Sequence, residues 1–124
     1  MFREVKAMMQ NQVSGDEYDE QIILWSEAAV RDLETSTEIV LPGRVSITRT
    51  LEAATTSEPE HWVITDNSTL KDRLAICAIA TYCCMNIGNP PNYENLRKAY
   101  ESLKGQMRLS RNYTRYGGAG AECG

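Results

Sequence analysis

The sequence predicts an all-α protein, a small bundle of about four helices with a β-hairpin inserted between the second and third long helical segments. Apolar residues recur at three- and four-residue steps along most of the chain, which is the spacing of helices that bury one face. Helical spacing disappears over residues 38–66, and at Val45, Ile47 and Arg49 β-branched side chains alternate with polar ones, which is the spacing of strands. At 124 residues, 42% of them apolar, the chain has the length and composition of one folded domain.

Two helices are expected before the hairpin. Residues 2–10 form a short helical pattern, which a turn at residues 14–16 interrupts. The second helix is expected from about Asp16 to Thr35, and carboxylates in its first turns complement the positive end of its dipole. Its apolar stripe consists of Tyr18, Ile22, Trp25, Ala29 and Leu33.

The hairpin is expected over about residues 38–66. A turn at Pro42 and Gly43 precedes the first strand, and the segment from Trp62 to Thr65 has the composition of a returning strand. Between the strands lies the polar segment LEAATTSEPE, which is too long for a tight turn, so we expect an exposed tip. Because two strands alone are marginally stable in water, the hairpin should lean on the helices or on a neighbouring subunit.

Two further helices are expected after the hairpin. The third is predicted from residue 68 or 69 to Gly88, and the fourth from residue 92 or 93 to about Arg108. From Leu74 onward the third is apolar nearly all round, as expected of a helix surrounded by others. The predicted organisation is a helical domain over residues 1–108, which contains the hairpin, and a flexible C-terminal tail over residues 109–124.

The sequence offers little for catalysis. His61 is the one histidine, and no partner motif accompanies it, so we expect a surface or packing role. Cys77, Cys83 and Cys84 have spacings that match no zinc site, and we expect them to pack as small apolar side chains. No glycine-rich phosphate-binding loop follows a strand. We therefore expect no enzyme, no catalytic residues, no cofactor and no metal.

The sequence also contains no segment typical of secretion or membrane insertion. The N-terminal residues lack an apolar core long enough for a signal peptide. The most apolar stretch, from Leu74 to Ile87, has 14 residues. A membrane-spanning helix needs about 20. We therefore expect a soluble, intracellular protein with reduced cysteines and no membrane partner.

Charge is distributed unevenly along the chain. Residues 1–67 carry five basic and thirteen acidic side chains, whereas residues 68–124 carry eight basic and four acidic ones. This asymmetry would let identical copies attract one another head to tail. Arginine and tyrosine interleave near the C-terminus, and this mixture is favoured at protein interfaces. The same mixture can also follow a nucleic-acid backbone. A solvated tail without a specific function is the remaining alternative. The candidate interface residues are Arg108, Arg111, Tyr113, Arg115 and Tyr116.

Nearly the whole chain up to Tyr116 carries a diffuse pattern of recurring residues. An apolar helix started by Asp or Ser leads to a Tyr and an Asn-x-Gly break, followed by a Tyr-containing helix and a terminal S-x-x-Y. The segments DEYDEQIILWSEAAVRDL and LPGRV precede it. This arrangement resembles the head-tail connector proteins (adaptor, or head-completion proteins) of tailed bacteriophages. The residues that carry the pattern are Asp66, Ser68, Tyr82, Asn86, Gly88, Tyr93, Tyr100, Lys104, Ser110 and Tyr113.

The resemblance implies a structural virion protein at the head-tail interface, present in the bacterial host cytoplasm during assembly. Proteins of this family form a ring, usually of twelve copies, on the portal protein, and extend the DNA channel toward the stopper or tail-completion protein. The genomic DNA then passes through the lumen without sequence-specific binding. The hairpin tip would offer a surface to the neighbouring subunit or the next ring. Its candidate residues are Leu51, Glu52, Thr55, Glu58 and Glu60.

Two other functions remain open from the sequence. A DNA-binding or packaging accessory protein would use the basic last helix and tail on phosphates, although the net charge of −4 weighs against it. Binding to duplex DNA that weakens steeply with salt would favour this alternative. The other is a helical protein-binding domain unrelated to phages, which would stay monomeric and never join a portal ring.

Overall fold

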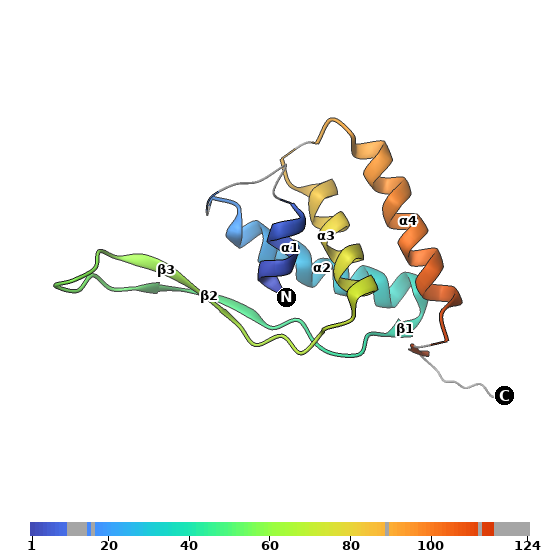
Figure 1. Cartoon of the computed structure of the whole chain (residues 1–124), viewed down its shortest axis with the longest axis horizontal. Helices are drawn as coiled ribbons and strands as arrows, with labels where there is room; N and C mark the ends of the chain where they lie inside the picture. Colours follow the sequence, from blue (N-terminus) through green and yellow to red (C-terminus); the bar gives the residue numbers. More distant parts are fainter. Residues whose placement is uncertain (10–14, 16, 89, 112, 116–124) are drawn as a thin grey trace.

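The structure is a computed structural model of the whole chain, and it describes residues 1–9, 15, 17–88, 90–111 and 113–115. Within these residues, four helices pack into one body, and two strands leave it as a long arm (Figure 1). The helices are α1 (Phe2–Met8), α2 (Asp19–Thr37), α3 (Arg73–Asn86) and α4 (Tyr93–Leu109). The strands are β1 (Ile39–Val40), β2 (Ile47–Glu52), β3 (His61–Asp66) and β4 (Thr114–Arg115).

The prediction of an all-α protein is wrong, because the chain is a mixed domain of helices and antiparallel strands. β2 and β3 pair antiparallel from Ile47 opposite Asp66 to Glu52 opposite His61. A second two-stranded sheet joins β1 to β4 and so pairs the segment after α2 with the segment after α4. β-Branched side chains on both strands of the arm favour the extended conformation, so this segment forms strands although most of the chain is helical.

The core lies around α3, which contacts each of the other three helices. α3 is buried on several sides, as its apolar composition predicts, and α1 and α4 lie on either side of it in the view of Figure 1. From α2, the side chains of Ile22, Ala29 and Leu33 are fully buried against this core. Trp25, which belongs to the same predicted stripe, is only partly buried and packs its ring against Tyr82.

The third helix begins later than predicted, at Arg73. Asp72 is its N-cap, and a side-chain oxygen of Asp72 accepts a hydrogen bond of 2.9 Å from the Ala75 N–H. The hydroxyls of Ser68 and Thr69 instead accept hydrogen bonds from backbone N–H groups in the segment that leads into β2. These two residues therefore fix the base of the arm and do not start the helix.

The first residues of the predicted tail belong to the folded body. Tyr113 is 8% exposed and its hydroxyl donates a hydrogen bond to Asp72, and β4 follows it directly. The packed chain therefore extends beyond the predicted boundary at residue 108. The rest of the predicted tail, residues 116–124, lies outside the described residues.

Candidate interaction surfaces

One face of the arm carries apolar side chains along its whole length. Opposed residues of β2 and β3 point to the same side, and successive pairs alternate between the two faces. Ile47 and Ile64 belong to one face near the body, where Ile47 is 4% exposed. Farther out on the same face lie Leu51 and Trp62, which are directly opposite each other and are 47% and 52% exposed. The apolar face therefore continues past the part that the body covers.

Arg49 connects the covered and the exposed parts of this face. Its guanidinium carbon lies 4.0 Å from the centroid of the Trp62 ring, within the range of a cation–π contact. Its Nη1 atom lies 3.7 Å from a carboxylate oxygen of Glu20 in the first turn of α2. The arm is thus held to the helical body at its base, and the Trp62 ring is held against the arm.

The arm tip is shaped by its own hydrogen bonds. The Thr55 N–H donates to the Glu58 carbonyl at 2.7 Å, and the Glu58 N–H donates to the Thr55 hydroxyl at 3.0 Å. All residues from 51 to 60 are exposed, and they include Glu52, Glu58 and Glu60 but no lysine or arginine. Each of the predicted tip residues therefore lies on a solvent-facing, negatively charged end of the arm.

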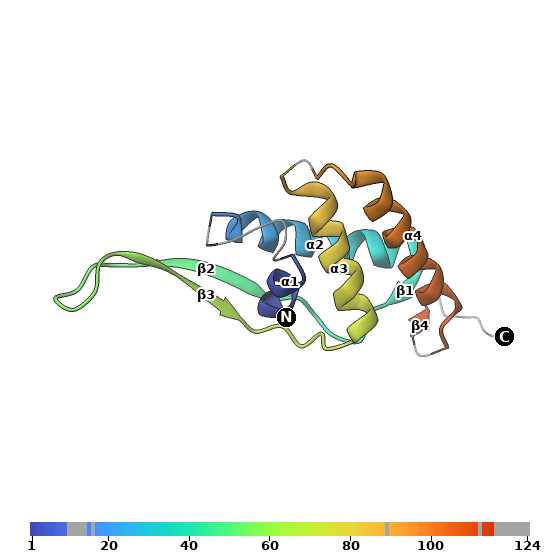
Figure 2. The same cartoon turned by 45° about the horizontal axis from the view of Figure 1, so that its top comes forward.

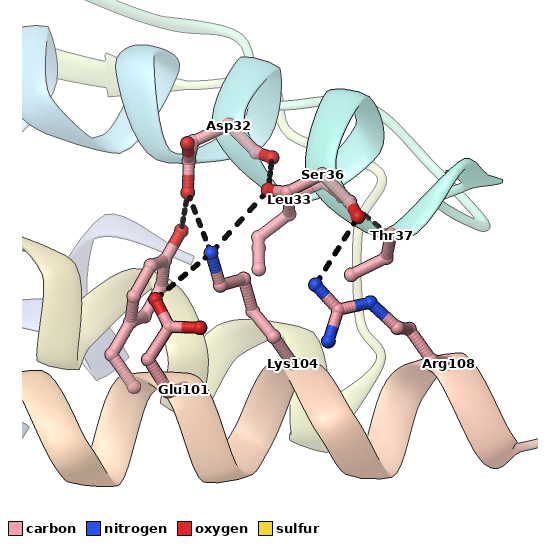
Figure 3. Close-up of polar contacts among 8 residues, drawn as sticks. Asp32, Leu33, Ser36, Thr37, Glu101, Lys104 and Arg108 are labelled. Atoms are coloured by element: carbon pink, nitrogen blue, oxygen red, sulfur yellow. Dashed lines mark hydrogen bonds and ion pairs between the residues drawn. The ribbon is translucent and has the colours of Figure 1, made fainter.

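A polar network joins α2 to α4 on the opposite side of the molecule from the arm (Figures 1 and 3). Lys104 is 7% exposed, and its Nζ atom lies 3.6 Å from Asp32 Oδ2 and 3.1 Å from Glu101 Oε2. The Tyr100 hydroxyl donates to Asp32 Oδ2 at 2.5 Å, and Lys104 Nζ donates to the Ser36 hydroxyl at 3.4 Å. Burial and the bond to the Asp32 carboxylate raise the pKa of Tyr100 well above its usual range. The network fixes the crossing of the two helices.

The predicted basic tail residues are distributed between the surface and the interior. Arg108 is exposed and donates from Nη2 to the Ser36 carbonyl at 3.3 Å, and Arg111 is exposed just beyond α4. Tyr113 is buried, and burial together with its bond to the Asp72 carboxylate raises the pKa of its hydroxyl above the usual range. Arg115 belongs to β4, and Tyr116 lies outside the described residues.

The structure therefore does not bring the two predicted interface groups together. The arm tip and the C-terminal end of α4 lie at opposite ends of the molecule (Figures 1 and 2). Their roles as contact surfaces stay predictions. Exposed apolar residues outside the predicted sites include Trp62 on the arm and Leu109 at the end of α4, the latter 85% exposed. The composition of residues 62–65 placed Trp62 on a strand but did not show that its side chain lies beyond the part that the body covers.

An open groove of about 930 Å³ lies along the outer face of α2. Val30, Val40 and Val45 contribute its apolar part, and Arg31 and Arg44 are among its charged residues. One wall carries Glu34, whose carboxylate accepts a hydrogen bond of 3.0 Å from the Leu41 N–H. Sequence patterns did not reveal this groove, because its walls come from α2, the segment after it and residue 69.

The reactive side chains occupy ordinary environments in the described part of the chain. His61 is exposed on the arm, with Nε2 3.7 Å from a Glu58 carboxylate oxygen. Cys83 is fully buried beside Ser26, and burial raises the pKa of its thiol to about 12. Among the residues that the structure describes, no group of three or more His, Cys, Asp or Glu side chains is placed to hold a metal ion.

No described helix combines the length and the apolar composition needed to cross a membrane. In the comparisons with known proteins, no family model, no curated protein and no solved structure matches the chain.

Proposed function

We propose that the protein is a structural subunit of a head-tail connector, which forms a ring on the portal vertex of a tailed bacteriophage. In this function it extends the DNA channel toward the stopper or tail-completion protein and performs no chemistry. The proposal starts from the sequence resemblance to the connector family. The observation that carries it is the arm, whose outer apolar face at Leu51 and Trp62 is left uncovered by its own helical body.

An exposed apolar pair on a two-stranded ribbon is typical of a surface that another chain covers. Leu51 and Trp62 lie side by side across the strands, so they form one continuous patch rather than two isolated residues. Tryptophan is enriched among the residues that dominate binding energy at protein interfaces. In a ring, every subunit meets a neighbour on two sides, so a projecting arm has a partner in each copy.

The positions of the charges also support a ring. The arm tip is acidic, whereas the last helix and the residues after it are mostly basic, and these two parts lie at opposite ends of the molecule (Figure 1). Contacts between unlike surfaces of identical subunits close into rings when the rotation between neighbours is suitable. The elongated molecule thus has two different ends that could meet in successive copies.

Electron microscopy of the cognate portal protein mixed with this protein tests the proposal. We expect an additional ring of density on the side of the portal that faces the tail. The variant Trp62→Asp should weaken this density, because it places a charge in the apolar patch of the arm. Leu24→Asp is the matched control, since Leu24 is 61% exposed on α2 within the helical body and its replacement should leave the ring in place.

A portal that binds no protein under these conditions would reject the connector function. The DNA-binding alternative makes a different prediction for the same protein. It requires binding to duplex DNA that weakens steeply with salt and is lost in the variant Arg111→Ala with Arg115→Ala. In the structure Lys104, one of the basic residues of the last helix, is buried in the network with α2, so it presents little positive charge to a phosphate backbone.

A further inference from the structure

The outer half of the arm carries an apolar patch with negative charge at the tip beyond it. Leu51 and Trp62 form its apolar centre, and both are about half exposed. Glu58 and Glu60 lie in the exposed tip beyond it, and no lysine or arginine occurs from residue 51 to residue 60. A partner surface that fits this part of the arm therefore combines an exposed apolar residue with positive charge.

The same chain carries such a surface at its other end. Leu109 ends α4 and is 85% exposed, the largest exposure among the large apolar side chains described. Lys98 lies eleven residues earlier in the helix, about three turns, and so it shares a face with Leu109 about 16 Å away. Arg108 and Arg111 are exposed on either side of Leu109 in the sequence. We call these four residues the end patch.

The acidic residues near the end patch are engaged within the chain. Glu94 forms an ion pair of 3.1 Å with Arg97, and Glu101 forms one of 3.1 Å with Lys104. These pairs reduce the negative potential on this side of α4. The end patch is therefore complementary in charge to the arm, and its apolar centre matches the apolar pair of the arm.

We propose that the outer arm of one copy docks on the end patch of a second copy. Leu51 and Trp62 of one copy then cover Leu109 of the next. Glu58 and Glu60 of the tip lie beside Lys98, Arg108 and Arg111. This inference rests on the proposed function, because it specifies how neighbouring subunits of the ring contact each other.

Contact within one molecule is excluded by the fold. The arm extends from one end of the body, and the C-terminal end of α4, where Leu109 lies, is at the opposite end (Figures 1 and 2). Because the two surfaces differ, each copy uses its arm on one neighbour and its end patch on the other. Such an arrangement continues from copy to copy until it closes.

Charge reversal tests the contact. The arm variant is Glu58→Lys with Glu60→Lys, and the patch variant is Lys98→Glu with Arg111→Glu. Self-association is measured by sedimentation velocity at low ionic strength over a range of protein concentrations. We expect each variant to associate at least about tenfold more weakly than the wild type, because like charges then face each other across the contact.

Restoration of the contact distinguishes docking from a general effect of charge. An equimolar mixture of the arm and patch variants should associate again, since each arm then meets a patch of opposite sign. A single chain that carries all four substitutions should also regain association. The control variant Glu17→Lys with Glu27→Lys changes two exposed acids on the body by the same amount and should associate as the wild type does.

Cross-linking identifies the contact directly. A carbodiimide joins adjacent carboxylates and amines without a spacer, and a mixture of ¹⁴N- and ¹⁵N-labelled protein separates bonds between copies from bonds within one copy. We expect mixed-isotope peptides that link Glu58 or Glu60 to Lys98. The inference is overturned if the arm variant associates like the wild type, if mixing restores nothing, or if the wild type stays monomeric at about 1 mM.

These results are independent of the portal experiment. If the copies associate through arm and patch but no ring forms on the portal, the connector function fails and the contact stands. If a ring forms on the portal and the arm and patch variants both join it normally, the contact fails and the connector function stands.

Discussion

Replacing Lys104 with methionine should destabilise the protein, because Lys104 is a nearly buried cation at the crossing of α2 and α4 (Figure 3). Methionine keeps an unbranched side chain of similar reach in the same space, so the packing of the stem is largely preserved. What is lost is the charge, together with its contacts to Asp32, Glu101 and Ser36. The substitution therefore isolates the polar contribution of the network.

The size of the expected loss in the free energy of unfolding follows from how exposed each partner of Lys104 is. Glu101 is 50% exposed, so its ion pair within the helix contributes only about 0.3–0.5 kcal/mol. The Asp32 side chain is 38% exposed and can recover water, so its pair with Lys104 contributes well below the 3–5 kcal/mol of a fully buried pair, about 1 kcal/mol. The Lys104 ammonium lies 4.9 Å from the Tyr100 ring centroid, which adds about 0.5–1 kcal/mol. The expected loss in the free energy of unfolding is about 1.8–2.5 kcal/mol.

Urea unfolding followed by far-UV circular dichroism measures this loss as a lower midpoint with an unchanged slope. The control is Lys98→Met on the exposed side of the same helix, which should change the free energy of unfolding by less than about 0.5 kcal/mol. A double-mutant cycle with Asp32→Asn should give a coupling energy of about 0.5–1 kcal/mol. Equal unfolding curves for wild type and Lys104→Met would refute the assignment of this network as the link between the helices.

Other predictions concern the backbone and the buried side chains. Gly43→Ala should destabilise the protein by more than about 2 kcal/mol, because Gly43 has φ +143° and its new Cβ would lie 2.6 Å from a backbone atom of residue 70. Gly105→Ala should instead stabilise the protein by about 0.5–1 kcal/mol in the same urea assay, because its new Cβ on α4 meets open space. The folded-state pKa values of Tyr100 and Tyr113 are raised above the ordinary tyrosine value of 10.0, so their contribution to stability is complete below about pH 10 and is lost as the pH rises further. Absorbance at 295 nm should show that both hydroxyls ionise only when the protein unfolds. The buried Cys83 thiol, with its pKa near 12, should react with a thiol reagent only after denaturant is added, as peptide mapping would show.

Local sequence patterns located the long helices well, because each helix buries one face and its apolar residues therefore recur at a regular spacing. Ile22, Ala29 and Leu33 were predicted to lie on one stripe of the second helix, and all three are fully buried. The end of that helix was harder to predict, because no glycine marks it. Glu38 adopts the left-handed conformation there, at φ 59°, and this rarely used conformation has no signal in the sequence.

The features that join distant parts of the chain could not be read from local patterns. β1 and β4 have two residues each and are about 75 residues apart, so neither has enough length to show a strand period. Tyr113 was predicted to be an interface residue, but it is buried and its hydroxyl donates to Asp72, the N-cap of α3. A lysine in an amphipathic helix is ordinarily exposed, and the burial of Lys104 depends on Asp32, which lies 72 residues earlier.

The candidate surfaces were predicted in part. The sequence placed an exposed tip between residues 51 and 60, and every residue of this segment is exposed. It did not reveal that Trp62 completes an apolar pair with Leu51, because the register of two strands depends on their pairing and not on either strand alone. Nor did it reveal the groove along α2, whose walls come together only in the folded chain.

Within the described residues, β2 and β3 pair only with each other, so each strand of the ribbon has one unsatisfied edge. The N–H and C=O groups along these edges can template a further strand, and such edges are the usual starting points of aggregation. The alternating threonines at positions 48, 50 and 65 favour an extended conformation without contributing charge that would discourage stacking. Storage at high concentration should therefore favour ordered aggregates nucleated by the ribbon, and lysines introduced at these threonines should suppress them.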